Sequence, residues 1–455
     1  MESILNPNVN VCSSPSDLRI TDMRFVNVKG LPMHCILMKL YTNQGIVGYG
    51  EVRDGASKQY ALQLKHILIG ENPCNVDKLF RRIKQFGGPA RQAGGVSAVE
   101  VALWDLAGKA YGQPVYRLLG GKFRDRIRIY CDTDVAGKHT GKDMGAALKA
   151  RMEKGFTFLK MDLGLGILRD VPGAVSAPLG FMDEPAAISE KLQAASDAGS
   201  DLDARFYKNR LYDYNNIPHP LTGIHVTELG FDVLEQYVKD VRETVGYEIP
   251  LAIDHFGHIG LEDSIKLCRR IEKYNLAWAE DLIPWQLTDQ YAILRRSTTV
   301  PICTGEDIYL KENFLPLLEA GGVSVIHPDV LSTGGILETK KISDMAADHG
   351  VAMAVHMAES PIGCLAAVHA AAVSENFTAL EFHSVDVPEW NDIYDDGLPK
   401  PLVQNGYITV PERPGLGIET LNDEVLAKYI HPDVPGMWEP TDAWDTDPCH
   451  DRIWS

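Results

Sequence analysis

The sequence predicts an α/β fold in which a parallel (β/α) barrel follows a smaller α+β domain. Two observations carry this prediction. Before about residue 111, short β-rich runs give way to segments in which apolar residues recur every three or four positions. After residue 125, eight short apolar runs alternate with helical stretches, which is typical of βα units that close into a barrel.

The first domain is expected to span residues 1–125. Residues 1–16 are expected to form a loose arm. Residues 18–51 contain three β-rich runs separated by Gly, Pro and Asn, which favours three antiparallel strands. Residues 58–111 have helical spacing. Strands followed by helices within one unit indicate an α+β domain.

Residues 126–386 are expected to form the barrel. Eight apolar runs indicate its strands: RIRIYCD, TFLKMDL, IPLAIDHFG, LAWAEDL, VPICTGED, SVIHPDV, VAMAVH and ALEFH. Helical spacing fills the intervals between them, as a parallel barrel requires. Residues 387–455 are rich in Pro and Trp and are expected to form an irregular C-terminal segment.

A long insertion is expected after the second barrel strand. Lys160 and Asp254 are 94 residues apart, whereas the next strand ends recur every 26 residues, which predicts an insertion at about 165–226. Because it is rich in Tyr, Pro, Asn and Arg, we expect it not to be a plain helix. It is expected to cover the catalytic face as a lid, with residues 205–225 reaching the site, or to form a subunit contact.

Composition excludes several classes of partner. The chain has 455 residues, and 44 Lys and Arg against 62 Asp and Glu give a formal charge of −18. Such an acidic surface argues against nucleic acid or an anionic membrane as partner, while a small anionic substrate stays possible. The chain has no apolar run of membrane-spanning length and no N-terminal signal pattern. Eight scattered cysteines without a CxxC pair favour reduced thiols and a cytoplasmic location.

Three acids end three successive barrel strands: Asp254, Glu280 and Glu306. The carboxyl ends of barrel strands share one mouth, so these carboxylates should converge. Converging carboxylates cannot all stay ionised without a cation, and oxygen ligands favour a hard ion such as Mg²⁺. The simpler alternative is that each acid caps the following helix, but three acids in equal steps favour a metal site.

Asp329 and His356 end the next two strands and are expected to form a catalytic pair. An Asp that accepts a hydrogen bond from one imidazole nitrogen makes the other nitrogen a better base. Lys160 ends the second strand and is expected to hold a substrate carboxylate. The alternative for His356 is a packed histidine with a polar partner. The alternative for Lys160 is a surface lysine paired with Asp162.

Three segments together form a specific pattern: VSAVEVALWDLAGKAYGQPVYRLLGG at residues 96–121, HPDVLSTGGILETKKISDMAADHGV at 327–351, and PGLGIE at 414–419. With the strand-end residues, they resemble the enolase superfamily and, within it, the mandelate racemase-like branch. The resemblance covers about residues 18–419. It implies a modified (β/α)₇β barrel and an N-terminal α+β capping domain that the C-terminal segment completes.

The resemblance also assigns roles to residues. The family's three Mg²⁺ ligands match Asp254, Glu280 and Glu306. Its His–Asp base matches His356 and Asp329, and superfamily sites of this kind pair a Lys or His base with Mg²⁺ to stabilise an enediolate.

The last barrel strand and the second one carry further matches. Glu381 matches an acid that donates a hydrogen bond to the developing enolate, and Lys160 matches the first lysine of a Lys-x-Lys motif. The second lysine, which is the base on the opposite face in the family, is replaced here by Asp162. A carboxylate is a weak base, so racemisation by two bases is disfavoured, whereas elimination by one base is not.

A second departure concerns the proton donor. Family dehydratases often carry a histidine two positions after the first metal ligand, where this chain has Phe256. His255 and His258 flank that position, and His258 is the better candidate for the acid, with a purely structural role as the alternative. The protonated His356 could itself supply the proton if the elimination is syn. Substrate contacts are expected from two capping-domain loops and the insertion: His34, Arg53, Arg205 and His225.

These features predict a Mg²⁺-dependent dehydratase that converts a sugar acid, an aldonate or aldarate, to a 2-keto-3-deoxy acid. The protein is expected to be a homo-oligomer whose partner is a small carboxylate substrate. An epimerase or cycloisomerase that uses the same enediolate stays open, as does a non-catalytic member that only binds metal or ligand. A metal-dependent hydrolase would usually carry an early His-x-His pair, which the first barrel strand lacks.

Overall fold

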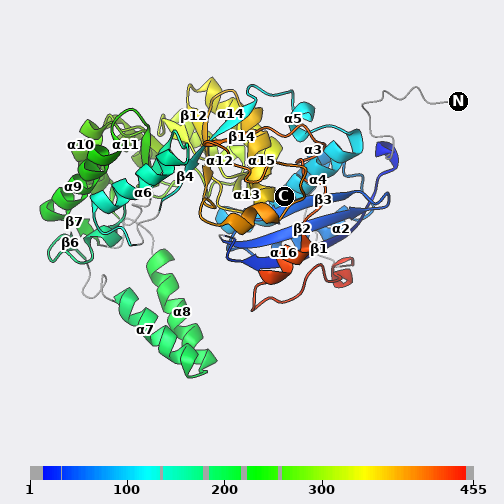
Figure 1. The fold of residues 1–455 in the computed structure, drawn as a ribbon, viewed down its shortest axis with the longest axis horizontal. Helices are drawn as coiled ribbons and strands as arrows, with labels where there is room; N and C mark the ends of the chain where they lie inside the picture. Colours follow the sequence, from blue (N-terminus) through cyan, green and yellow to red (C-terminus); the bar gives the residue numbers. More distant parts are fainter. Residues whose placement is uncertain are drawn as a thin grey trace.

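The N-terminal domain is a three-stranded antiparallel sheet with helices packed on one face (Figure 1). Its elements are β1 (Ile20–Lys29), β2 (His34–Thr42), β3 (Val47–Val52), α1 (Gln59–Leu62), α2 (Lys65–Leu68), α3 (Val76–Ile83), α4 (Gly94–Tyr111) and α5 (Val115–Leu118). Helix α4 packs directly on β3. The glycine at position 50 permits this close approach, because a Cβ there would collide with the carbonyl oxygen of Ala98. The computed structural model describes residues 14–446, except 32, 134–136, 178–183, 217–222, 255–258 and the side chains of 212–216.

Eight parallel strands close into a barrel through the pairing of the last strand with the first. They are β4 (Arg126–Cys131), β5 (Leu159–Asp162), β8 (Leu251–Asp254), β9 (Ala279–Glu280), β10 (Ile302–Thr304), β11 (Val325–Ile326), β12 (Ala352–Val355) and β13 (Phe377–Phe382). The helices between them are α6 (Gly141–Glu153), α9 (Glu228–Val245), α10 (Leu261–Ile271), α11 (Thr288–Arg296), α12 (Lys311–Glu319), α13 (Val330–Thr333), α14 (Ile336–Asp348) and α15 (Pro361–Ala372). The predicted (β/α)₇β barrel with an N-terminal capping domain is confirmed.

The barrel interior below the mouth is filled with side chains. Tyr130, Phe158 and Trp278 pack there with small residues from the other strands. On most strands this apolar layer lies two positions before the strand-end polar residue, so the polar groups stand above an apolar floor.

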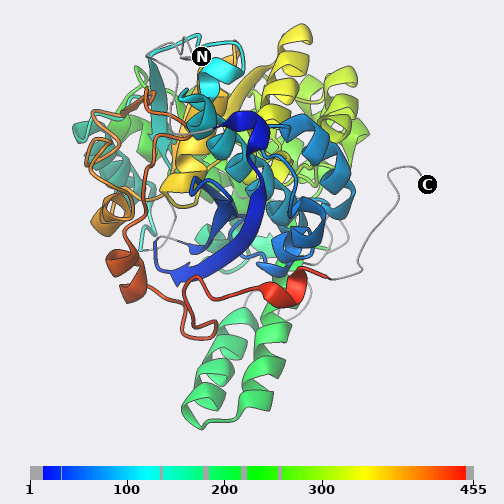
Figure 2. The same cartoon turned by 90° about the vertical axis from the view of Figure 1, so that its right-hand side faces the viewer.

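The insertion, which we expected not to be a plain helix, consists of two helices and two short strands. It contains β6 (Val175–Ser176), α7 (Glu184–Asp197), α8 (Asp201–Asn216) and β7 (His225–Val226). Its prolines do not interrupt these helices, because Pro185 lies in the first turn of α7, where no backbone N–H is needed. Helices α7 and α8 form a hairpin that projects from the body of the molecule (Figures 1 and 2).

The C-terminal segment runs from the barrel back to the capping domain. Strand β14 (Tyr407–Thr409) pairs antiparallel with the outside of β4, and α16 (Asp423–Lys428) follows. Bridges then join Ile430 and Met437 to β1. Within the part of the chain that the structure describes, no helix combines the length and apolarity that crossing a membrane requires.

Asp105 on α4 joins the sheet, the helix and the C-terminal segment. Its buried carboxylate accepts hydrogen bonds from the backbone N–H groups of Tyr49 (2.9 Å) and Leu416 (2.8 Å) and from Lys109 Nζ (2.7 Å). Replacing it removes the carboxylate partner of the Lys109 ammonium group and leaves two backbone donors without their acceptor.

We predict that Asp105→Ala lowers the free energy of unfolding by about 3–5 kcal/mol, because one partner of a buried ion pair is removed. Urea denaturation followed by circular dichroism measures this. The control is Asp396→Ala, since Asp396 is exposed and forms a surface ion pair with Lys400 across 3.0 Å, so the variant should unfold like the parent. Equal midpoints for all three proteins would contradict the assigned role of Asp105.

Candidate active site

Lys160 stands at the centre of the barrel mouth. Its buried Nζ lies 2.6 Å from Asp254 Oδ2, 2.7 Å from Glu381 Oε1 and 3.5 Å from Glu280 Oε2, so β5, β8, β9 and β13 meet around one ammonium group. Burial lowers the pKa of Lys160, but the three carboxylates outweigh burial and hold it well above its ordinary value. The lysine is therefore a fixed positive charge rather than a base.

The three predicted metal ligands all end strands at this mouth, but the structure groups them unevenly. Asp254, Glu280 and Asp281 each offer an oxygen, and these oxygens lie within 4.8 Å of one another. Glu306 turns toward His356, with 3.2 Å between Glu306 Oε2 and His356 Nε2. Asp281 was not predicted; it has a φ of +50°, and its burial and the neighbouring carboxylates raise its pKa well above the ordinary value.

This group of acids fits a divalent cation. The donors are carboxylate oxygens, which hard cations prefer, and their mutual distances suit ligands around one ion. Glu280 Oε1 is buried without a hydrogen bond, although it lies 2.5 Å from His327 Nδ1. Lys160 alone cannot neutralise this many buried carboxylates, so a cation would lower their repulsion.

Asp329 and His356 form the predicted pair. A parallel bridge joins their backbones, and His356 Nδ1 lies 2.6 Å from Asp329 Oδ2. Burial raises the pKa of Asp329, but the charges of Arg53 and His356 outweigh burial and lower that pKa to about 2. Burial lowers the pKa of His356, but the carboxylate of Glu306, followed by those of Glu381 and Asp329, raises it to about 10.

Arg53 reaches this pair from the capping domain. Its fully buried guanidinium contacts Asp329, lies 2.7 Å from Glu359 Oε1 and is 3.6 Å from Glu306 Oε1. The sequence predicted a substrate contact for Arg53, whereas the structure shows it held by carboxylates of the protein. Glu359 was not predicted, because nothing in its local sequence indicates a partner 306 residues away.

Two histidines beside the predicted residues were also missed. His327 lies two positions before Asp329, and its Nε2 lies 2.6 Å from the hydroxyl of buried Tyr130. His383 lies two positions after Glu381, and its Nε2 lies 3.4 Å from Glu381 Oε1. Residues two apart on an extended chain face the same side, so this spacing was the available signal.

Glu381 lies among three cationic or basic groups. Burial raises its pKa, but Lys160, His356 and His383 outweigh burial and hold it well below the ordinary value. This direction favours an ionised carboxylate over the hydrogen-bond donor that the resemblance implies.

The remaining predicted residues do not gather at one point. Asp162 lies beside Asp254 in the strand register, and its carboxylate is within 4.8 Å of those of Asp132 and Asp254. The His34 ring packs against that of His431, tilted by 47°, with 4.6 Å between the ring centroids.

Two predicted substrate contacts lie on the insertion, and one predicted acid cannot be placed. Arg205 is exposed on the projecting α8. His225 is exposed on β7, 3.4 Å from Asp263 Oδ2. His258 lies outside the described residues.

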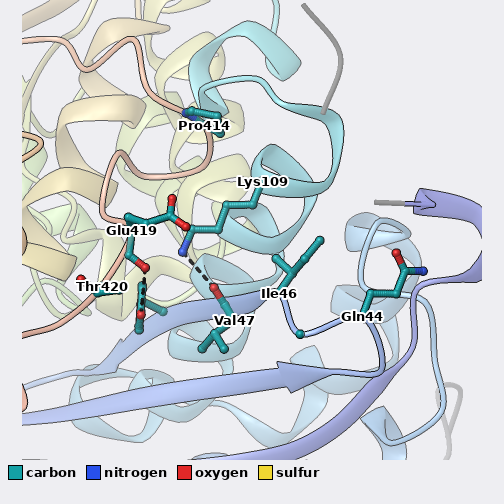
Figure 3. A pocket seen from close by; sticks show the side chains of 9 residues that line it. Gln44, Ile46, Val47, Lys109, Pro414, Glu419 and Thr420 are labelled. Atoms are coloured by element: carbon teal, nitrogen blue, oxygen red, sulfur yellow. Dashed lines mark hydrogen bonds between the residues drawn. The ribbon is translucent and has the colours of Figure 1, made fainter. Parts of the chain in front are cut away.

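A separate hollow of about 400 Å³ lies between the sheet and the C-terminal segment (Figure 3). Lys109 and Glu419 are among its lining residues, and Lys109 donates to the carbonyl oxygen of Val47 at 2.8 Å. None of the barrel strand-end residues described above lines this hollow, so it is distinct from the barrel mouth.

Comparison with known proteins agrees with this architecture. Residues 18–120 match the N-terminal domain of mandelate racemase and muconate lactonizing enzymes, and residues 223–425 match the enolase C-terminal domain-like family. The chain belongs to the mandelate racemase/muconate lactonizing enzyme family of the enolase superfamily. The sequence-based resemblance is thus confirmed.

Individual relatives extend over nearly the whole chain. A D-xylonate dehydratase of Haloferax volcanii is 32% identical over 437 residues, covering 94% of this chain and 92% of that protein. A D-galactonate dehydratase of Ralstonia pickettii is 27% identical, covering 90% and 94%. The crystal structure of a mandelate racemase/muconate lactonizing enzyme-like protein from Rubrobacter xylanophilus has a TM-score of 0.75 at 30% identity, covering 92% and 99%.

We predict that Glu306→Gln lowers the pKa of His356 in the metal-free protein, because Glu306 is the anion that most strongly favours the imidazolium. NMR titration of labelled histidine measures this, with the His356 signal assigned by its loss in His356→Asn. Glu319→Gln, at an exposed position of α12, is the control and should leave the pKa unchanged. An unchanged pKa in Glu306→Gln would contradict the described contact.

Proposed function

We propose that the protein is a hydro-lyase that dehydrates a sugar acid, an aldonate or aldarate, to a 2-keto-3-deoxy acid with Mg²⁺ as cofactor. The main support is the His356–Asp329 pair beside Lys160 and the acid cluster, with a carboxylate, Asp162, where a second basic lysine would stand. The names of the dehydratase relatives support the same reaction. Cytoplasmic location and a homo-oligomeric state stay predictions from the sequence.

In this proposal Asp254, Glu280 and Glu306 hold the cation. A bound Mg²⁺ would stabilise negative charge on the substrate carboxylate. Lys160 orients that carboxylate and adds a fixed positive charge in a buried site, where electrostatic stabilisation is strong. Glu306, once neutralised as a ligand, no longer raises the pKa of His356, which then approaches the neutral form that a base requires.

His356 is the proposed base. Its Nδ1 faces Asp329, so Nε2 is the nitrogen that takes the proton from the carbon next to the carboxylate. The electron pair left on that carbon is delocalised into the carboxylate as an enediolate. It then forms a carbon–carbon double bond as the hydroxyl on the next carbon leaves, and the enol product tautomerises to the keto acid. Epimerisation would need a base on the other face, and Asp162 is a weak one.

The direct test is to incubate the purified protein with Mg²⁺ and a panel of sugar mono- and diacids that includes D-xylonate and D-galactonate. We expect one or more of the acids to yield a 2-keto-3-deoxy acid. Exchange of the α-proton in D₂O without keto-acid formation would favour epimerisation instead. No reaction and no exchange with any acid would overturn the proposal.

We predict that His356→Asn lowers kcat by about 10²- to 10⁴-fold, the contribution of one general base, and that it abolishes α-proton exchange in D₂O. Exchange is followed by NMR on the best substrate of the panel. His349→Asn, at the exposed end of α14, is the matched control and should behave like the parent. Normal exchange in His356→Asn would place the base elsewhere.

We predict that Glu280→Gln weakens Mg²⁺ binding by more than the roughly 10- to 100-fold that loss of an outer-shell partner costs, because a charged ligand is removed. Titration calorimetry with Mg²⁺ alone measures this, and circular dichroism checks the fold. Glu319→Gln should bind Mg²⁺ like the parent. Undiminished binding by Glu280→Gln would remove Glu280 from the ligand set.

A further inference from the structure

A second histidine–aspartate pair lies at the barrel mouth. His383 Nδ1 lies 3.9 Å from Asp132 Oδ2, and the His383 ring centroid is 6.0 Å from that of His356. Glu381 lies between the two histidines, 3.4 Å from His383 Nε2 and 3.8 Å from His356 Nε2. The mouth therefore carries two imidazoles on either side of one carboxylate, each with an aspartate near its Nδ1.

The exposure of these groups indicates which of them faces the opening. The side chain of His383 is 18% exposed, although its Nε2 is buried beside Glu381, whereas the side chains of Glu381 and Lys160 are 0% and 1% exposed. A substrate whose carboxylate lies against Lys160 would thus meet the His383 imidazole above Glu381.

The other groups near this point are poorly suited to give up a proton. Lys160 is paired with three carboxylates, and Glu381 is surrounded by cations that favour its ionised form. His356 carries the proton that it removes from the α-carbon, and it could return that proton only to an oxygen that leaves from the same face of the substrate. His383 is a partly exposed imidazole, a group that can donate a proton near neutral pH.

We propose that His383 is the general acid that protonates the leaving hydroxyl and that Asp132 is a positioning residue that orients it. The proposal rests on the function proposed above. His356 takes the α-proton, the electron pair of that C–H bond becomes the carbon–carbon double bond, and the C–O bond on the next carbon breaks. The leaving oxygen takes a proton from His383 and departs as water, and His383 is reprotonated from solvent.

The test compares two leaving groups in His383→Gln. One substrate is the best acid of the panel, and the other is its analogue with fluorine in place of the leaving hydroxyl, because fluoride departs without a proton. We expect dehydration to fall by about 10²- to 10⁴-fold, while fluoride release and α-proton exchange in D₂O stay close to the parent rates. Asp132→Asn should show a smaller loss with the same selectivity for the hydroxyl substrate.

The controls separate this inference from the function on which it rests. His349→Gln should match the parent on both substrates. Equal losses for hydroxyl and fluoride, or loss of α-proton exchange, would overturn the proposal, because His383 would then only support Glu381 and the base. An unchanged dehydration rate would also overturn it and place the acid elsewhere. If the parent protein dehydrates no acid of the panel, the proposed function itself fails.

Discussion

The site depends on one constraint, an excess of buried carboxylates over buried cations at the barrel mouth. Successive strand ends deliver Asp254, Glu280, Glu306 and Glu381, with Asp281 beside them, around the single ammonium group of Lys160. Buried charges of one sign are costly unless they are paired. This excess makes a divalent cation fit the site, and it raises the pKa of His356 where no cation is bound.

The capping domain completes the site instead of merely covering it. Arg53 follows β3 and contacts Asp329, while Glu51, two positions earlier, accepts from the backbone N–H groups of Ser360 (3.1 Å) and Gly363 (3.0 Å) at the start of α15. Glu100 on α4 does the same at the start of α14, accepting from Ile336 N (2.7 Å). Both buried carboxyl groups accept hydrogen bonds from backbone N–H groups that have no partner within the helices, so these contacts join the two domains at the catalytic face.

The insertion is not one plain helix, but its two longest elements, α7 and α8, are regular helices despite its content of Tyr, Asn, Arg and Pro. The position of the prolines explains this, since Pro185 lies in the first turn of α7 and α8 contains no proline. The hairpin of α7 and α8 projects outward from the body of the molecule (Figures 1 and 2), and the contact of residues 205–225 with the barrel mouth stays a prediction.

The sequence by itself determined the barrel, the capping domain and the strand-end residues. Each barrel strand is a short apolar run that ends in an ionisable residue, and a step of 26 residues separates successive acids along part of the chain. Lys160, Asp254, Asp329, His356 and Glu381 could be found in this way. The partners of these residues could not. Arg53 and Asp329 are 276 residues apart, and Asp132 and His383 directly follow the first and last strands of the barrel. Local periodicity does not encode which side chains meet when strands close a barrel and a second domain docks on it, so the tertiary structure alone decided those contacts.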